Sequence, residues 1–271
     1  MFIRWLKLTD TPEIISIAKE MDIEVDTYHI KLILTHFPHL CFGIYKENML
    51  AGVILTVEYE KNIQIKYFMV KNNFQKKNLG KRLLKTLMEI AKMYNKNVYL
   101  IFPEKYQLFF ENFGFKKTVD INKWINRGNV PPFYFSNKEA KELESYDFEN
   151  KVQILDYETF NEERTFYLFE EMQRNSSLKF ALPDSFQHSC SITSKDVFLG
   201  PWISKDEYEA EKMIKGVLFF RGLKRVISYS PDIKNINKLF KKYNFEKTEK
   251  LVFLSYGDCE INFNNIYSFS F

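Results

Sequence analysis

The chain has 271 residues, of which 45% are hydrophobic and 17% aromatic, and its formal net charge is only +4. Gly and Pro are too scarce for a collagen-like chain or a disordered linker, and apolar side chains are abundant enough to form a sizeable core. At about 150 residues per domain, the length fits two modest domains or one large one.

Several protein classes are excluded by the distribution of residues. The longest apolar runs, such as Val217–Phe220, are too short to span a bilayer, so no membrane partner is expected. No signal peptide is expected either, because Met1–Lys7 leads into no apolar segment with a small-residue cleavage site. Lysines alternate with acidic residues instead of gathering in one stretch, which argues against a nucleic-acid partner. Three widely separated cysteines, Cys41, Cys190 and Cys259, suit a reducing cytoplasm and are expected to be buried thiols.

The chain opens with a predicted short strand, Ile3–Leu8, and two helices. Thr11 is the expected hydroxyl N-cap of the first helix, with Pro12 at the first helical position, where its missing N–H costs nothing. Apolar residues then recur at helical spacing up to Met21. The second helix is expected over Thr27–Thr35.

Three apolar segments separated by polar turns follow, and they predict a meander of antiparallel strands. A helix, a strand, a short helix beginning at Pro103 and a further strand come next. The order predicts an α/β (α+β) domain. The three strands are Leu40–Tyr45, Leu50–Tyr59 and Ile63–Val70, and the next helix, strand and helix are Lys81–Tyr94, Asn97–Phe102 and Pro103 to about Asn112.

The second half repeats the tail of the first. Val98–Phe102 and the segment Phe109–Thr118 have counterparts in Val226–Ser230 and Leu239–Thr248. Gly114 corresponds to Asn244, and both residue types tolerate the left-handed conformation at a helix C-terminus. An internal duplication explains this better than chance.

The duplication and a break in the pattern divide the chain. Around Ile121–Pro132 turn residues replace the periodic segments, and Lys138–Asn150 is highly charged, as expected for a solvated helix or connector. We expect an N-terminal domain over 1–125, a linker over 126–150 and a C-terminal domain over 151–271.

The stretch Val70–Leu84 carries the strongest chemical signal. A strand ends, a polar loop follows and a helix begins, and a helix N-terminus with exposed N–H groups can hold a pyrophosphate. The stretch contains neither GxxxxGK[ST] nor GxGxxG spacing. Positive charge comes from Lys76, Lys77, Lys81 and Arg82, although a plain solvated charge run explains these residues as well.

This stretch resembles the acyl-CoA pyrophosphate loop of the GNAT superfamily of N-acyltransferases, V-x-P-x-x-[RQ]-x-x-G-x-[GA]. Val70, Gln75 and Gly80 match that pattern, and Phe110–Phe115 resembles the Y-E-K-x-G-F motif of the family's fourth helix. Residues 151–271 resemble, more loosely, the second half of bacterial members that have two GNAT-like halves. The resemblance implies two GNAT-like domains, each with a mixed, mostly antiparallel sheet flanked by helices.

The implied activity is transfer of an acetyl or other acyl group from acyl-CoA to a primary amine of a small molecule or a protein. Acetyl-CoA is then a co-substrate, no metal is required, and the C-terminal domain shapes the acceptor pocket. The resemblance assigns CoA binding to the end of the fourth strand, the loop, the start of the helix and one residue of the fourth helix: Phe68, Met69, Val70, Gln75, Lys76, Lys77, Asn78, Leu79, Gly80, Lys81 and Phe110.

Two residues depart from the family pattern. Asn78 replaces the first glycine of the loop; it can adopt positive φ, but its side chain crowds a close phosphate. Phe110 occupies the place of a Tyr that protonates the CoA thiolate, and it has no proton to give. Tyr106, four residues earlier on the same predicted helix, is the candidate acid, although ordinary packing of its ring explains it equally well.

Attack of an amine on a thioester also needs a base and an oxyanion donor. Glu58 and Glu60 are candidate bases, with exposed turn carboxylates as the simpler explanation. The oxyanion donor is expected among the backbone N–H groups of Phe68–Val70, where the third and fourth strands are predicted to separate.

Other clusters carry weaker signals, and two alternatives to an enzyme stay open. His36 and His39 flank a proline with no third ligand nearby, so a metal site is not expected. Ser185, His188 and Cys190 are close in sequence only. The alternatives are a non-catalytic CoA-binding or protein-interaction module, and a structural dimerisation protein; a homodimer is compatible with the duplication.

Overall fold

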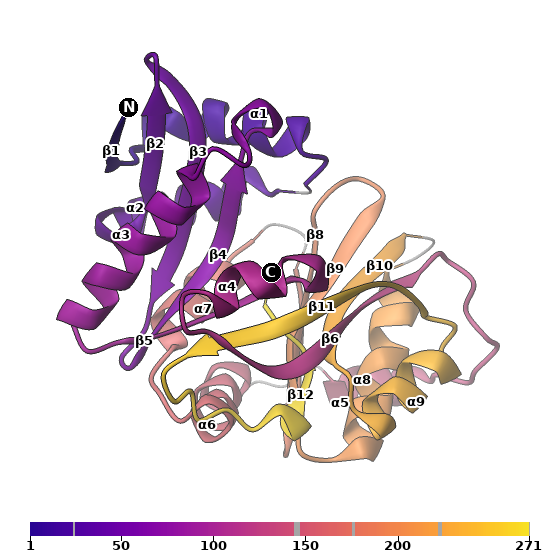
Figure 1. The fold of residues 1–271 in the computed structure, drawn as a ribbon. Coiled ribbons are helices and arrows are strands. Elements are labelled where there is room, and N and C mark those ends of the chain that lie inside the picture. Colours follow the sequence, from indigo (N-terminus) through magenta and orange to yellow (C-terminus); the bar gives the residue numbers. More distant parts are fainter. Residues whose placement is uncertain (24, 144–146, 175–176, 222–223, 271) are drawn as a thin grey trace. The chain divides into compact units, whose positions relative to one another are not determined.

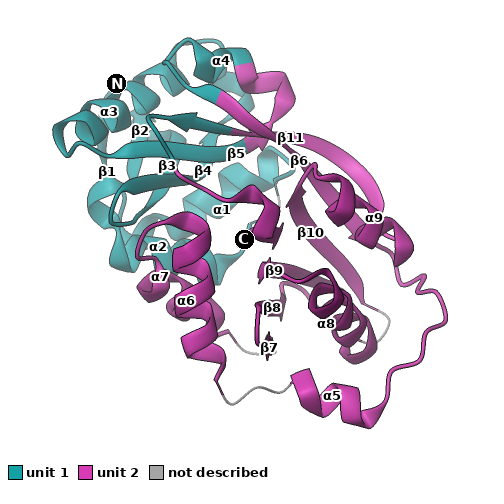
Figure 2. Cartoon of the chain, turned by 90° about the horizontal axis from the view of Figure 1, so that it is seen from below, with its two compact units in different colours: residues 1–101, 108–116, 254–259 teal, residues 102–107, 117–253, 260–271 magenta. Residues whose placement is uncertain are grey.

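The computed structural model describes residues 1–23, 25–143, 147–174, 177–221 and 224–270 and contains the predicted alternation of helices and strands (Figure 1). The chain divides into two compact units, each built from several segments (Figure 2). Unit 1 comprises 1–101, 108–116 and 254–259, and unit 2 comprises 102–107, 117–253 and 260–271.

The first half follows the predicted order of elements. In chain order these elements are β1 (Phe2–Trp5), α1 (Thr11–Glu20), α2 (Thr27–His36), β2 (Phe42–Lys46), β3 (Met49–Glu58), β4 (Asn62–Val70), α3 (Leu79–Met93), β5 (Asn97–Pro103), α4 (Gln107–Glu111) and β6 (Lys116–Asn126).

The second half has more helix before its sheet. Its elements are α5 (Asn137–Leu143), α6 (Phe148–Phe160), α7 (Thr165–Met172), β7 (Ser177–Leu182), β8 (Ser185–Ser191), β9 (Asp196–Ser204), α8 (Glu207–Phe220), β10 (Arg225–Pro231), α9 (Lys234–Lys242), β11 (Glu246–Tyr256) and β12 (Ile266–Ser268). Within the charged span 138–150, residues 144–146 lie outside the described residues.

Two local predictions at the N-terminus need correction. The first strand ends at Trp5, three residues early, because the Asp10 carboxylate accepts hydrogen bonds from the Lys7 N–H and from Arg4 and turns the chain. Helix α1 therefore begins at Thr11 itself, with Asp10 at the N-cap and Pro12 second in the helix. The Thr11 hydroxyl donates backwards to the Leu8 carbonyl at 2.7 Å.

The helix expected from Pro103 is also interrupted. A 3-10 turn spans Glu104–Tyr106, and only Gln107–Glu111 are α-helical. Tyr106 thus ends a tighter turn than the helix that contains Phe110.

The sheet of unit 1 confirms the antiparallel meander. Strands β1 to β4 pair antiparallel in sequence, and β5 pairs parallel to β4. The end of β11, Leu254–Tyr256, lies beyond β5. Helix α3 buries Leu83, Leu84 and Leu87 completely, which stabilises the unit by about 2 kcal/mol per side chain.

The sheet of unit 2 has the same plan. Strands β7, β8 and β9 form an antiparallel meander, and β10 pairs parallel to β9 as β5 does to β4. Strand β6 pairs antiparallel to β10, with β11 on its other side. Helices α8 and α9 cover a core that includes the buried Trp124 and Trp202.

The repeated tails end in the same helix cap. Gly114 and Asn244 both have positive φ, 87° and 58°. In each copy the N–H of the following Phe donates to the carbonyl of a Phe five residues earlier: Phe115 to Phe110 at 3.3 Å and Phe245 to Phe240 at 3.0 Å. This Schellman geometry satisfies helix carbonyls and confirms the predicted equivalence of Gly and Asn.

Candidate acyl-CoA site

The loop between β4 and α3 is tied back to the protein by its own side chains. The Gln75 amide donates to the Val70 carbonyl at 3.1 Å, which closes the loop onto the end of its strand. Asn72 binds the C-terminal residue of α1, Glu20, through two hydrogen bonds, and the Phe74 ring is buried. These contacts fix the path of the loop before α3 begins.

Two residues of the loop adopt the left-handed conformation. Asn78, at the N-cap of α3, has φ 63°, so the turn predicted for a glycine there is made by an Asn. Lys76 has φ 59°, which the sequence did not predict.

The backbone N–H groups of residues 76–81 find no hydrogen-bond acceptor among the described residues, as expected for a helix start that can bind an anion.

The charges of the loop face solvent. Lys76, Lys81 and Arg82 are exposed, while Lys77 donates to the Asn73 carbonyl and lies over the Phe74 ring. The side chains of Met69 and Leu79 are buried, so these residues can offer a ligand only their backbone. Exposed cations and unpaired N–H groups together favour a phosphate.

Phenylalanine rings gather beside Gly80. The Phe68 ring stacks on Phe109 with centroids 5.9 Å apart and meets Phe110 edge-on at 5.8 Å. A Cβ at Gly80 would lie 3.3 Å from the Phe68 ring, so a larger residue there would fit only if that ring moved by a few tenths of an ångström. Phe110 is fully buried and packs against these rings at the position where the family pattern has the Tyr that protonates the CoA thiolate.

The strands that separate are β4 and β5. The prediction that the third and fourth strands, β3 and β4, separate was wrong. Strands β3 and β4 stay paired to Gly52 and Val70, whereas the β4–β5 register ends at Ile65 and Leu100. The register of β3 and β4 places a β-bulge at Lys66, and bulges bend a strand. The divergence therefore begins where β4 is bent.

The carboxylates chosen as candidate bases lie away from the loop. Glu58 pairs with Ile63 in the register, and Glu60 lies in the turn between β3 and β4. Val70 lies seven positions after Ile63, which is about 23 Å along a strand. Glu58 is held by Lys96 at 3.3 Å and by His39 at 3.0 Å.

The candidate acid Tyr106 lies in unit 2, whereas the loop and Phe110 lie in unit 1. Its ring meets Phe102 edge-on at 5.4 Å. The roles predicted for Tyr106, Glu58 and Glu60 stay predictions.

Buried polar groups on β4 were missed in the sequence. The Gln64 side-chain oxygen accepts a hydrogen bond from the Tyr59 hydroxyl at 3.1 Å and lies 3.5 Å from the Tyr99 hydroxyl. Further along β4, the Tyr67 hydroxyl is 2.8 Å from Nδ1 of His29 on α2. A polar residue within an otherwise apolar strand, as in Asn-Ile-Gln-Ile, was the available signal.

The equivalent helix start in the second half is built differently. The Asp206 side chain accepts from the Glu209 N–H at 2.8 Å and caps α8, and the first turn also contains Glu207. A self-capped, acidic helix start repels phosphate. The two halves therefore share a fold but differ in their capacity to bind an anion.

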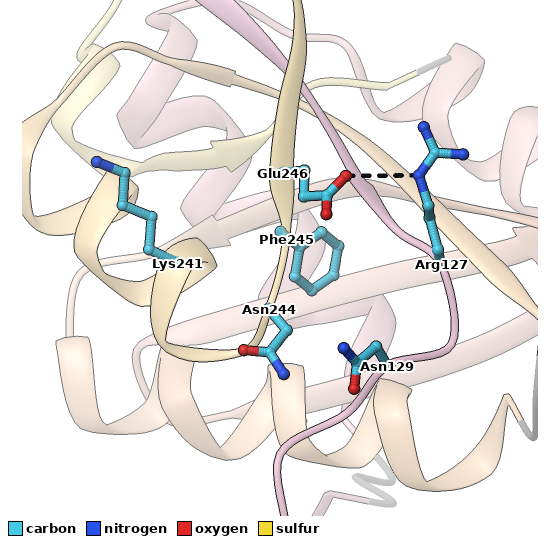
Figure 3. Close-up of a pocket in the computed structure, with 6 residues that line it drawn as sticks. All are labelled: Arg127, Asn129, Lys241, Asn244, Phe245 and Glu246. Atoms are coloured by element: carbon cyan, nitrogen blue, oxygen red, sulfur yellow. Dashed lines mark hydrogen bonds and ion pairs between the residues drawn. The ribbon is translucent and has the colours of Figure 1, made fainter.

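A separate hollow of about 330 Å³ lies in unit 2, at the C-terminal end of α9 (Figure 3). Arg127 and Glu246 form an ion pair across it at 3.4 Å. None of the residues predicted for the site lines it. The residues that do are Arg127, Asn129, Lys241, Asn244, Phe245 and Glu246.

In the part of the chain that the structure describes, the other candidate nucleophiles and metal ligands do not assemble into a site. Burial raises the pKa of the Cys41 thiol to about 12, which keeps it protonated. Ser185 bonds Ser204, whereas His188 bonds the Gly200 carbonyl and Ser177, so the Ser-His-Cys cluster is not brought together. Over the described residues, no group of three His, Cys, Asp or Glu side chains is placed to hold a metal. Within that same part of the chain, no helix combines the length and apolarity needed to cross a bilayer.

Comparison with known proteins supports the fold. The sequence model described as "Acetyltransferase (GNAT) domain" matches residues 38–117, a segment that includes the loop. No curated protein sequence matches the chain.

Among solved structures, a protein from Pyrococcus horikoshii proposed to be an acetyltransferase is 17% identical, with a TM-score of 0.85 over 99% of this chain and 93% of its own. A GCN5-related N-acetyltransferase from Sphaerobacter thermophilus has a TM-score of 0.64 at 11% identity, covering 98% of both chains. A tandem GNAT protein from the clavulanic acid biosynthesis pathway has a TM-score of 0.61 at 11% identity, over 94% of this chain and 98% of its own. Residues 38–117 thus match a GNAT domain model, and the chain as a whole has the fold of two GNAT domains.

Proposed function

We propose that the chain transfers an acyl group, most simply acetyl, from acyl-CoA to a primary amine. The proposal is carried by the start of α3. There the N–H groups of residues 76–81 find no acceptor among the described residues, and Lys76, Lys81 and Arg82 are exposed beside them. A pyrophosphate satisfies these groups and interacts favourably with the helix dipole.

The first half is the proposed acyl-CoA-binding domain, 1–125, followed by a linker to 150 and a second domain that lacks a phosphate site. Helix α8 of the second domain begins with acidic residues and is capped by Asp206, which supports the absence of a phosphate site there. The acceptor is an amine of a small molecule or a protein. A cytoplasmic location agrees with Cys41 and Cys190, which are buried thiols outside any disulfide.

Acetyl-CoA binding is the first test. At a hundredfold excess over Kd, binding stabilises the folded chain by about 2.7 kcal/mol, which raises the unfolding temperature by several degrees. Lys81→Glu reverses a charge beside the proposed pyrophosphate and is expected to weaken binding about tenfold, measured by calorimetry. Lys238→Glu, on the exposed side of α9, is the matched control with unchanged affinity.

Turnover is measured next by thiol release over a panel of amines. Release that depends on an amine supports the transferase. Binding of acetyl-CoA without thiol release for any amine favours the non-catalytic CoA-binding module. Phe110 agrees with that module too, because its side chain has no acidic proton to donate to the thiolate. No thermal shift at millimolar acetyl-CoA contradicts both.

A further inference from the structure

Strand β4 presents two different faces beyond its bulge. The Phe68 ring lies beside Gly80 of α3, so α3 covers the Phe68 face. Successive side chains of a strand point to opposite faces, and Tyr67 therefore points to the other face, where it meets His29 of α2. Figure 2 shows α3 and α2 on opposite sides of the unit 1 sheet.

The contact between Tyr67 and His29 is specific and buried. The Tyr67 hydroxyl is 2.8 Å from Nδ1 of His29, and the rings meet edge-on with centroids 5.5 Å apart. The Asp26 side chain caps α2 and fixes the helix turn that carries His29. His29 is fully buried, whereas Tyr67 keeps 9% of its surface exposed, so the tyrosine is the member of the pair that a small substrate can reach.

The bulge places a second polar group on the same face. In the register Leu55 pairs with Tyr67 and Val57 pairs with Gln64. Leu55 and Val57 are two residues apart and share a face, so Gln64 and Tyr67 share it too. This face is polar where β4 leaves β5, while the opposite face is a cluster of phenylalanine rings.

We propose that Tyr67 is a catalytic residue that accepts a proton from the acceptor amine, and that His29 is its positioning residue. The inference rests on the proposed acyl transfer. The donor's pyrophosphate is assigned to the α3 side, so the amine approaches from the α2 side, where this pair lies at the diverging edge of β4.

In this step the amine nitrogen attacks the thioester carbonyl carbon, the C–N bond forms, and the C–S bond breaks with its electron pair leaving on sulfur. The nitrogen loses a proton to the Tyr67 oxygen as the Tyr67 proton passes to Nδ1 of His29. Tyr67 then donates a proton through solvent to the thiolate, while the buried His29 returns its proton to the Tyr67 oxygen. The products are an amide and the CoA thiol, and both side chains recover their initial state.

The test compares Tyr67→Phe, His29→Gln and the double variant with the wild type, using the best amine of the panel. Loss of proton transfer is expected to lower kcat about 100-fold in Tyr67→Phe, with KM for the amine within a few fold. His29→Gln keeps a hydrogen-bonding side chain and is expected to lose about tenfold. The double variant is expected to lose no more than Tyr67→Phe, because His29 acts through Tyr67.

Tyr45→Phe is the matched control, since Tyr45 is another buried tyrosine of unit 1, on β2. Its kcat is expected to stay at the wild-type value. Calorimetry with acetyl-CoA and thermal unfolding show whether each variant is folded and loaded.

A folded Tyr67→Phe that binds acetyl-CoA and retains wild-type kcat overturns the role of the pair while the transferase stands. Additive losses in the double variant overturn the action of His29 through Tyr67. A wild type that binds acetyl-CoA but acylates no amine overturns the transferase, and the role of the pair with it.

Discussion

Single residues in the loop decide whether it can bind a phosphate. Asn78 and Lys76 hold φ values of 63° and 59°, a region that costs most L-residues about 1 kcal/mol or more. Asn tolerates this conformation better than other residues with a side chain. The loop thus keeps its turn without the glycine of the family pattern.

Replacing Asn78 separates backbone strain from ligand contact. Asn78→Ala is expected to destabilise the chain by about 1 kcal/mol, because the Cβ of Ala is strained at positive φ and Ala has no polar side chain that offsets this strain. Asn78→Gly is expected to be neutral or stabilising and to tighten acetyl-CoA binding a few fold, since it removes the crowding side chain. Urea unfolding and calorimetry measure both effects, and equal stability of the two variants would contradict this account.

A buried histidine predicts how stability depends on pH. Burial lowers the pKa of His188 to about 4, so the folded chain keeps it neutral while the unfolded chain takes up a proton near pH 6.5. Stability from this group is therefore complete above pH 6.5 and lost as the pH falls toward 4. Between pH 7.5 and pH 5 the expected loss is about 2 kcal/mol.

Urea unfolding of the wild type and His188→Gln at both pH values isolates that contribution. His188→Gln is expected to lose about 2 kcal/mol less than the wild type on acidification. If the unfolding free energy of His188→Gln falls with pH as steeply as that of the wild type, the pH dependence does not come from His188.

At the scale of elements, the chain uses one strand-helix unit twice, with a basic helix start at α3 and an acidic one at α8. Helix α3 begins at an N-cap with no side-chain hydrogen bond, whereas Asp206 caps α8 with its own carboxylate. The duplicated tail and the elements of the first half could be predicted, because hydrophobic periodicity and cap residues are local properties of the sequence, whereas α6, α7, β7 and β8 were not predicted. The short α4 could not be predicted, since its 3-10 turn follows from how the chain packs after β5.

Removing the cap of α8 tests this division of roles. Asp206→Ala is expected to cost about 1 kcal/mol, because the Glu209 N–H loses its acceptor. Asp206→Asn keeps an acceptor oxygen and is expected to cost less. Acetyl-CoA affinity should be unchanged in both variants, and a change in affinity would show that α8 contributes to the site.

At the scale of the molecule, each unit contains a piece of the other half of the sequence. Residues 254–259 belong to unit 1, where Gly257 packs against Asn97, and β6 lies in the sheet of unit 2. Trp124 of β6 stacks on Phe240 at 5.2 Å and donates to the Ser230 hydroxyl at 2.9 Å. The division at 125 is a division of the sequence, and the compact units follow different boundaries.

Splitting the chain after residue 126 is therefore expected to leave neither fragment stably folded alone. The first fragment lacks 254–259, and the second lacks Trp124 from its core. Circular dichroism and thermal unfolding of each fragment and of their mixture measure this, with recovery expected on mixing. A cooperative transition in the isolated first fragment would show that β11 is dispensable.

The sequence by itself determined the order of elements in the first half, the duplicated tail, the left-handed cap at Gly114 and Asn244, and the basic loop before α3, because each depends on neighbours in the chain. Tertiary structure decided which strands separate, where the candidate bases lie, and that Gln64, Tyr67 and His29 carry the polar groups around β4. A single bulge at Lys66 reverses the facing of every later side chain on that strand. Register is set by pairing between distant segments, and local patterns do not encode it.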